Sequence, residues 1–408
     1  MSQPPNDPAV LRFQPGLDAI DFKHLRAFVA VADGLNFGRA AERLFVSAPA
    51  LSRQIRALER AVGCQLFRRS THQVELTLAG EALLDCAHQV LADLERGVAT
   101  TRAVGGELDA RMSALWSPVV AAEGPDAISE RRIALERMLA QFPPPSDVEV
   151  LPVNAGGVPA LRLSPQDVAD DYVLLYLHGG GYVMGSAFGY RATVAALITE
   201  TRTAAIVPDY RLAPEHPFPA AVDDVFAAYN WLLDTGVPAD RIVLAGDSSG
   251  CALAALSMIR LRTEQLPLPA LAIMLSPWLD LTRTALDGHP DMGAEFGVTV
   301  EQVRYYVASY TGDRPLDDPL LSPLHADLAG LPPLLVQTGT GDPLMDDARR
   351  IVDHATECGG DARLELYPAD THVFHLFWSF LPAAVDALRS AGEYVNAARA
   401  AGGRTRTG

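Results

Sequence analysis

The stretch Gly246-Asp247-Ser248-Ser249-Gly250 lies between an apolar run, Arg241-Ile-Val-Leu-Ala245, and an alanine-rich run that begins at Cys251. These flanks predict a strand, a very sharp turn and a helix. In a G-x-S-x-G turn, glycines permit a strained backbone that lifts the serine hydroxyl above the sheet edge. The pattern indicates Ser248 as a nucleophile, although five loosely specified positions also fit an ordinary strand-to-helix turn.

Further apolar runs alternate with helical stretches on both sides of this turn. Continuous apolar strands separated by helices predict a sheet that is buried on both faces, and hence an α/β fold. The expected strands are residues 172–177, 204–207, 241–245, 271–275, 334–337 and 363–367. Residues 148–153 and 158–163, split by Asn-Ala-Gly-Gly, predict a hairpin ahead of them.

The first of these strands is followed by His178-Gly179-Gly180-Gly181. Three glycines let the backbone approach a ligand closely, so the N–H groups of Gly179 and Gly180 are expected to stabilise an oxyanion. The N–H of Ser249, the residue after the nucleophile, is expected to be a third donor. Taken alone, a glycine run after a strand also fits a plain loop or a phosphate-binding loop.

An acid and a histidine follow the last two predicted strands. Asp342 comes after residues 334–337 and His372 after residues 363–367, so both are expected at the carboxyl edge of the sheet, where ligands of such folds bind. His372 would take the Ser248 proton, and Asp342 would orient the imidazole. Other candidates, for which structural roles are the alternative, are Asp346, Asp347, Asp370 and His375.

Four linked motifs in this order resemble the hormone-sensitive-lipase-like branch of the α/β-hydrolases. They are His178-Gly-Gly-Gly181, Asp209-Tyr-Arg-Leu-Ala-Pro-Glu215 with His216-Pro-Phe-Pro-Ala-Ala221, Gly246-Asp-Ser-Ser-Gly250, and Asp342-Pro-Leu344. The resemblance covers about residues 110–400. It implies a Ser248–Asp342–His372 triad, an oxyanion hole formed by the Gly179, Gly180 and Ser249 amides, and a cap. Ser249 stands where alanine is usual, and Val373 where glycine often follows the histidine.

The first part of the chain has a different pattern. Apolar residues recur at helical spacing from Phe22, and Asp33-Gly34 ends that helix; Asn36 caps a second helix over residues 37–44. A third helix begins at Ser47, has Pro49 in its first turn and stops at Gly63. Two short helices joined by a tight turn, the second carrying Ser52, Arg53 and Arg56 outward, predict a helix-turn-helix.

Residues 23–69 hold nine Lys+Arg against three Asp+Glu, the charge that a DNA-facing surface requires. A basic solvated face is the alternative. The runs Leu25-Arg-Ala-Phe-Val-Ala-Val-Ala32, Asn36-Phe-Gly-Arg-Ala-Ala-Glu-Arg-Leu44, Pro49-Ala-Leu-Ser-Arg-Gln-Ile55, Leu66-Phe-Arg-Arg69 and Leu76-Thr-Leu-Ala-Gly80 closely resemble the DNA-binding region of LysR-type transcriptional regulators. The resemblance implies a winged helix-turn-helix with residues 47–56 in the major groove and Arg68 and Arg69 on phosphate. Ala48 replaces the usual Gln, so the base preference is expected to differ.

Charge and composition support a multidomain chain. Residues 1–106 carry a net charge of +1 and the remaining 302 carry −18, within a total of −17. We expect a disordered lead (1–20), a winged helix-turn-helix domain (21–77), a linker and dimerisation helix (78–106), a hydrolase domain (107–400) and a tail (401–408). Cap segments are expected near 107–142 and 282–320.

No apolar run is long enough to span a membrane, and no signal peptide is evident, which favours a cytoplasmic protein. Cys64, Cys86, Cys251 and Cys358 are scattered, which argues against a metal site or a disulfide framework. No metal, nucleotide or flavin motif is present, so no cofactor is expected. The expected partners are a small ester, double-stranded DNA through residues 21–77 and a second copy of the chain, as a homodimer or a higher homo-oligomer.

The sequence thus predicts a serine esterase for short-chain or small carboxylic esters, fused to a DNA-binding domain. The alternative is a LysR-like regulator whose hydrolase fold only senses an ester or lactone. A sensor without activity would normally have lost a triad residue or an oxyanion glycine, and all of these are present. Enzyme activity is therefore the favoured interpretation.

Overall fold

The computed structural model describes residues 20–69, 74–122, 127–169, 172–282 and 299–404. The expected lead at 1–20 lies almost wholly outside these residues, as does part of the expected cap segment at 282–320. Of the expected tail at 401–408, residues 401–404 are still part of the last helix, and 405–408 lie outside the described residues. The chain divides into two compact units, Met1–Glu107 and Leu108–Gly408. Each unit has its own apolar core.

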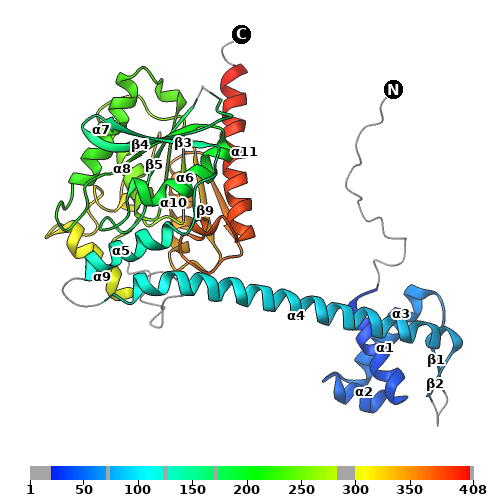
Figure 1. Ribbon diagram of the computed structural model, residues 1–408. Coiled ribbons are helices and arrows are strands. Elements are labelled where there is room, and N and C mark those ends of the chain that lie inside the picture. Colours follow the sequence, from blue (N-terminus) through cyan, green and yellow to red (C-terminus); the bar gives the residue numbers. More distant parts are fainter. Residues whose placement is uncertain (1–19, 70–73, 123–126, 170–171, 283–298, 405–408) are drawn as a thin grey trace. The chain divides into compact units, whose positions relative to one another are not determined.

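The first unit contains the predicted helix-turn-helix. Its helices are α1 (Phe22–Gly34), α2 (Phe37–Arg43) and α3 (Ala48–Val62). The predicted caps are confirmed: the side chains of Asn36 and Ser47 accept hydrogen bonds from the first turns of α2 and α3. The short strands β1 (Phe67–Arg69) and β2 (Val74–Leu76) pair antiparallel and form the wing, as Figure 1 shows.

Helix α4 runs from Leu78 to Val120, further than the expected end near residue 106. The boundary expected after residue 106, between the linker helix and the hydrolase domain, therefore falls inside one continuous helix. Each glycine costs a helix only about 1 kcal/mol, so Gly105 and Gly106 do not end a helix of this length. Pro118 lies in the last turn, so the helix continues for only two residues beyond it.

The second unit is built on one sheet with the strand order β10-β9-β8-β7-β5-β6-β4-β3. The six strands from β10 to β6 run parallel, and β3 and β4 add an antiparallel hairpin at one edge. The predicted α/β-hydrolase fold with a mostly parallel sheet is therefore confirmed. The strands are β3 (Val148–Ala155), β4 (Val158–Pro165), β5 (Val173–Leu177), β6 (Ala204–Pro208), β7 (Ile242–Asp247), β8 (Leu271–Leu275), β9 (Leu334–Gly339) and β10 (Ala362–Tyr367).

Helices cover both faces of this sheet. Every residue of β7, β8 and β9 is buried as a result. Helix α6 packs along α11, and α7 packs along α8 (Figure 1). The helices of this unit are α5 (Ala127–Leu139), α6 (Ala187–Thr201), α7 (Ala220–Asp234), α8 (Ser249–Thr263), α9 (Val300–Thr311), α10 (Met345–Glu357) and α11 (Pro382–Arg404), with short 3₁₀ turns η2 (Ala239–Arg241), η3 (Pro323–His325) and η4 (Phe374–Phe377).

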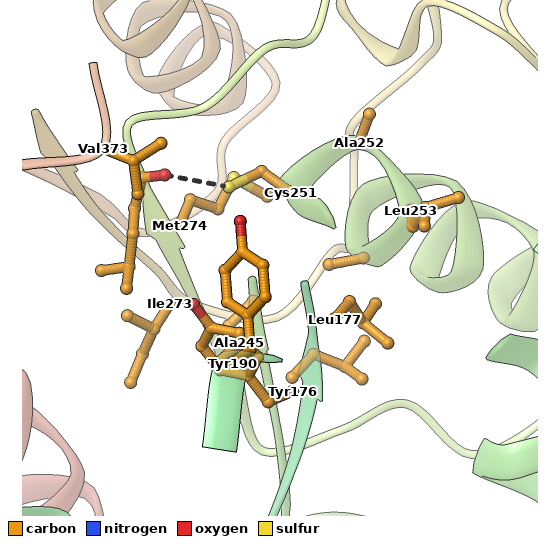
Figure 2. Packing of buried hydrophobic residues seen from close by; sticks show 14 of the residues in the cluster. Tyr176, Leu177, Tyr190, Ala245, Cys251, Ala252, Leu253, Ile273, Met274 and Val373 are labelled. Atoms are coloured by element: carbon orange, nitrogen blue, oxygen red, sulfur yellow. Dashed lines mark hydrogen bonds between the residues drawn. The ribbon is translucent and has the colours of Figure 1, made fainter. Parts of the chain in front are cut away.

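The core under the site is dense where β5, β7 and β8 meet α8. Figure 2 shows Tyr176, Ala245 and Ile273 from these strands beside Cys251 and Leu253 of the helix. These five residues are fully buried. The carboxyl ends of the strands are thus anchored in a close-packed interior, which fixes the loops that follow them.

Candidate active site

The turn between β7 and α8 holds Ser248 in a strained conformation. Its φ is 50° and its ψ is −119°, in the region of positive φ that residues other than glycine rarely adopt. The backbone N–H of Ser248 donates to the Leu275 carbonyl at 3.0 Å, and the Ser248 carbonyl accepts from the Trp278 N–H at 3.1 Å. These bonds to the end of β8 and to the loop after it hold the turn in place.

The two glycines of the motif are needed for space rather than for positive φ. A Cβ atom at Gly250 would lie 1.9 Å from the Leu177 carbonyl oxygen, and one at Gly246 would lie 2.7 Å from the backbone of Gly250. The turn therefore packs directly onto the end of β5, the strand that carries the glycine loop. The nucleophile and that loop are held against each other by backbone contact.

Ser248, His372 and Asp342 come together at the carboxyl edge of the sheet, from the ends of three different strands. The Oγ of Ser248 lies 2.8 Å from Nε2 of His372. The other ring nitrogen, Nδ1, lies 3.0 Å and 3.2 Å from the two carboxylate oxygens of Asp342. All three side chains are buried. This arrangement of nucleophile, base and orienting acid can perform acyl transfer.

Two opposing effects act on Asp342. Burial by itself raises the pKa of this carboxyl group, but the charge and hydrogen bond of His372 and the bond from the Leu344 N–H outweigh burial. The pKa of Asp342 is therefore held below its ordinary value. Asp342 stays ionised over the neutral pH range, as the orientation of a histidine requires.

The glycine loop after β5 departs from the sequence prediction at one position. The N–H of Gly179 donates to Oδ1 of Asp247 at 2.9 Å, so this amide is directed to a buried carboxylate and not to an oxyanion. Gly180 and Gly181 instead line the cavity beside Ser248. Both have positive φ, at 113° and 62°. The expectation of an oxyanion donor at Gly179 is therefore wrong, because the donor already has a partner within the fold.

Asp247 is a further residue of the site, which the motif spacing does not predict. Its carboxylate accepts hydrogen bonds from the Tyr176 hydroxyl at 2.8 Å and the Tyr190 hydroxyl at 3.2 Å, besides the Gly179 amide. Figure 2 shows the two tyrosines near each other. Burial raises the pKa of Asp247 to about 6, although all three hydrogen bonds act to lower it. Asp247 thus ties the glycine loop to the strand that carries the nucleophile.

A cavity of about 50 Å³ opens beside Ser248. Its walls are mostly apolar and come from elements far apart in the sequence. They include Trp116 of α4, Leu135 of α5, Val303 and Tyr306 of α9, and Leu376 of η4. The segments expected as caps, 107–142 and 282–320, therefore both contribute side chains to the cavity.

The alternative acids and the second histidine lie away from the cavity beside Ser248. The buried Asp347 carboxylate accepts the backbone N–H groups of Leu279 and Asp280, and burial raises its pKa to about 7. It supports the loop after β8. Asp370 is exposed, and His375 is fully buried, where desolvation lowers its pKa to about 3. Neither of the two lines the cavity, and Asp346 does not line it either.

The helix-turn-helix of the first unit presents a basic surface. Arg53, Arg56 and Arg60 line an open depression of about 800 Å³ along α3, and Arg60 had not been predicted. Ser47 and Pro49 are exposed at the start of α3, and Ser52 is half-buried. Arg68 is exposed on β1, whereas the side chain of Arg69 lies outside the described part of the structure. The spacing of Arg53, Arg56 and Arg60, three and four residues apart, was the signal for this face.

The remaining features concern cysteines, metals and membranes. All four cysteines are free thiols. Among the described residues, no group of three or more His, Cys, Asp or Glu side chains is arranged to hold a metal ion. Within the same residues, no helix is both long and apolar enough to cross a membrane.

Comparison with known proteins assigns both parts of the chain. Residues 174–376 match the family described as alpha/beta hydrolase fold, and residues 22–81 match the bacterial regulatory helix-turn-helix family of LysR. The chain is 38% identical to an acetyl-hydrolase of Streptomyces hygroscopicus over 279 residues, which are 67% of this chain and 92% of that protein. It is 33% identical to an esterase of Acinetobacter venetianus over 64% of this chain and 87% of the relative.

A solved structure shows the same likeness. The crystal structure of an esterase from the bacterial hormone-sensitive lipase family has a TM-score of 0.67 and 38% identity, and the match covers 70% of this chain and 96% of that one. The sequence motifs, the sheet and the relatives agree. The chain therefore belongs to the hormone-sensitive-lipase branch of the α/β-hydrolases, a branch of carboxylic ester hydrolases, and carries a LysR-family helix-turn-helix domain ahead of its hydrolase domain.

Proposed function

We propose that this protein is a serine carboxylesterase that hydrolyses small carboxylic esters through Ser248, His372 and Asp342. The observation that carries the proposal is the continuous hydrogen-bonded chain from Ser248 Oγ through both ring nitrogens of His372 to Asp342. Each contact is within hydrogen-bond reach, about 2.6–3.2 Å. The hydrogen-bonded side chains end at Ser248, in the wall of a mostly apolar cavity.

The reaction proceeds in two halves. Nε2 of His372 takes the proton from Ser248 as Oγ attacks the ester carbonyl carbon, and the carbonyl oxygen becomes an oxyanion. The tetrahedral intermediate collapses, the bond to the alcohol oxygen breaks, and the alcohol leaves with the proton from His372. Water then attacks the acyl-serine in the same way, releasing the carboxylic acid and restoring Ser248. Asp342 holds the imidazole in the required tautomer and stabilises its charged form.

The oxyanion is stabilised by backbone N–H groups of Gly180, Gly181 and Ser249. The positions of both glycines beside Ser248, with positive φ, support this assignment. Ser249 is the first residue of α8, and the N–H groups of a first helical turn have no partner within the helix. Such donors are already oriented before charge develops, so they stabilise the transition state more than the substrate.

Small substrates are supported by the cavity. A volume of about 50 Å³ beside Ser248 favours compact substrate groups over long chains. A relative with 38% identity is named an acetyl-hydrolase. Acetate and similarly short acyl esters are therefore the expected substrates.

The test is hydrolysis of p-nitrophenyl acetate, butyrate and octanoate by the full-length chain and by Ser248→Ala. We expect turnover by the wild type, fastest with the short esters, and loss of turnover in the variant. Ser257→Ala, a buried serine of the same helix α8, serves as the matched control. Retained activity in Ser248→Ala would refute the assignment; no turnover by the wild type would favour a ligand-sensing regulator.

A second function is supported by the basic face of α3. We propose that residues 21–77 bind double-stranded DNA in the cytoplasm, as a dimer that reads two half-sites. The protein then acts as an enzyme-regulator: the ester that signals to the DNA-binding domain is also the substrate, so hydrolysis ends the signal. Ser248→Ala is expected to prolong the transcriptional response to the ester, and an unchanged time course would contradict the coupling.

DNA binding itself is tested with fragments from upstream of the gene. A functional domain is expected to prefer such a fragment over random duplex of equal length, with an affinity that falls steeply with salt. Equal affinity for both duplexes would show a domain without regulatory specificity.

A further inference from the structure

Trp116, a residue of helix α4, forms part of the wall of the cavity beside Ser248. Its side chain is 6% exposed and lies among the residues that line the cavity beside Ser248. Its indole Nε1–H donates to Oγ1 of Thr371 at 3.0 Å. The ring also meets Phe377 of η4 edge to face, with the ring centroids 6.2 Å apart. Trp116 is thus held in one orientation from two sides.

The partner of Trp116 decides which end of the cavity it bounds. Thr371 directly precedes His372. Two cavity residues follow: Val373 on the same loop and Leu376 in the 3₁₀ turn η4. The hydrogen bond therefore fixes the indole to the loop that carries the catalytic base. The glycine loop, with Gly180 and Gly181, forms another part of the wall.

The chemistry of an ester orients the substrate between these walls. During acylation, the alcohol oxygen must lie within hydrogen-bond reach of His372 Nε2, because it leaves with the proton that this nitrogen carries. The carbonyl oxygen must lie against the backbone amides of the glycine loop. The group attached to the alcohol oxygen is therefore directed toward the wall made by the histidine loop and the residue bound to it.

We infer that Trp116 limits the size of the alcohol portion of the substrate, so that the enzyme prefers esters of small, compact alcohols. This inference rests on the proposed esterase function and adds a specificity-determining residue to it. A locked indole restricts the cavity more strictly than a flexible side chain, because moving it breaks a buried hydrogen bond and an aromatic contact.

The experiment compares two ester series on the full-length chain. One series keeps the acetyl group and enlarges the alcohol from ethyl to butyl to benzyl; the other keeps the ethyl group and lengthens the acyl chain from acetate to butyrate to hexanoate. Trp116→Ala is expected to raise kcat/KM for benzyl acetate relative to ethyl acetate by at least about tenfold, with the acyl series unchanged in order. Trp116→Phe, which keeps a ring of smaller size, is expected to give an intermediate shift and guards against loss of folding in the alanine variant.

Trp231→Phe is the matched control, since this tryptophan of α7 is only partly buried and is not among the residues lining the cavity. A shift in the acyl series instead of the alcohol series, or no shift in either with the activity retained, would overturn the inference about Trp116. Absence of turnover by the wild type, or turnover that survives Ser248→Ala, would instead refute the esterase proposal. The two failures are therefore distinguishable.

Discussion

Asp247 provides a quantitative test of how the site is held together. Its pKa rises from an ordinary 3.8 to about 6 through burial. Since one pKa unit corresponds to about 1.4 kcal/mol, ionisation of this group destabilises the folded hydrolase domain by roughly 3 kcal/mol at high pH. The pKa of Asp247 is higher in the folded state than in the unfolded state. The penalty is therefore absent below pH 3.8, grows as the pH rises toward the folded-state pKa, and is complete above it. Roughly half of this penalty develops between pH 5 and pH 8.

Asp247→Asn removes the ionisation and can keep the contacts. The amide oxygen can accept from Tyr176 and Gly179 as Oδ1 does, and the amide nitrogen can donate to the Tyr190 hydroxyl. Relative to wild type, the variant is therefore expected to gain roughly 1–2 kcal/mol of stability between pH 5 and pH 8. Any fixed cost of the substitution cancels in this difference.

The assay is urea unfolding followed by tryptophan fluorescence at both pH values. All four tryptophans lie beyond residue 107, so the signal reports on the hydrolase unit alone. Asp234→Asn, which removes an exposed acid of α7, is the control and is expected to show no such pH-dependent gain. A stability difference between Asp247→Asn and wild type that stays constant from pH 5 to pH 8 would refute the reasoning.

Three further outcomes are expected. Gly250→Ala places a Cβ atom 1.9 Å from the Leu177 carbonyl oxygen, so the urea midpoint should fall markedly; an unchanged midpoint would show that the turn can relax. Asp342→Asn should lower kcat by roughly 10³–10⁴ on p-nitrophenyl acetate, because His372 loses its orienting charge, and a wild-type kcat would contradict that role. Arg53→Ala should weaken DNA binding to all sequences about equally and reduce the salt slope by about one, as measured by titration at several salt concentrations; a loss confined to one sequence would indicate base contact instead.

The sequence was sufficient for the parts of the fold that depend on local pattern. Apolar runs and their flanking glycines located the strands from β5 to β10 within one or two residues, and Ser47 and Gly63 marked both ends of α3. The catalytic candidates followed from the same pattern, because a residue after a parallel strand reaches the carboxyl edge of the sheet. The spacing alone left other acids and a second histidine open, and the resemblance to the hormone-sensitive-lipase-like hydrolases selected the three side chains that the structure brings together.

Features that depend on long-range contacts were not predictable. The Gly179 amide is directed away from the cavity because Asp247, 68 positions later, accepts its hydrogen bond. Trp116 reaches the site through a bond to Thr371 across 255 positions. The helix continues through Gly105-Gly106 although glycine disfavours it, since the intrinsic cost of each glycine is only about 1 kcal/mol.

Helix α4 also determines how this protein can be divided. Its 43 residues extend about 65 Å, and the division between the two units, after Glu107, falls inside it rather than in a loop. A hydrolase fragment that begins at the first strand, Val148, lacks both Trp116 and Leu135 and so has an opened cavity. A hydrolase fragment that keeps the wall of the cavity must therefore include the end of this helix, which the two units share as one continuous element.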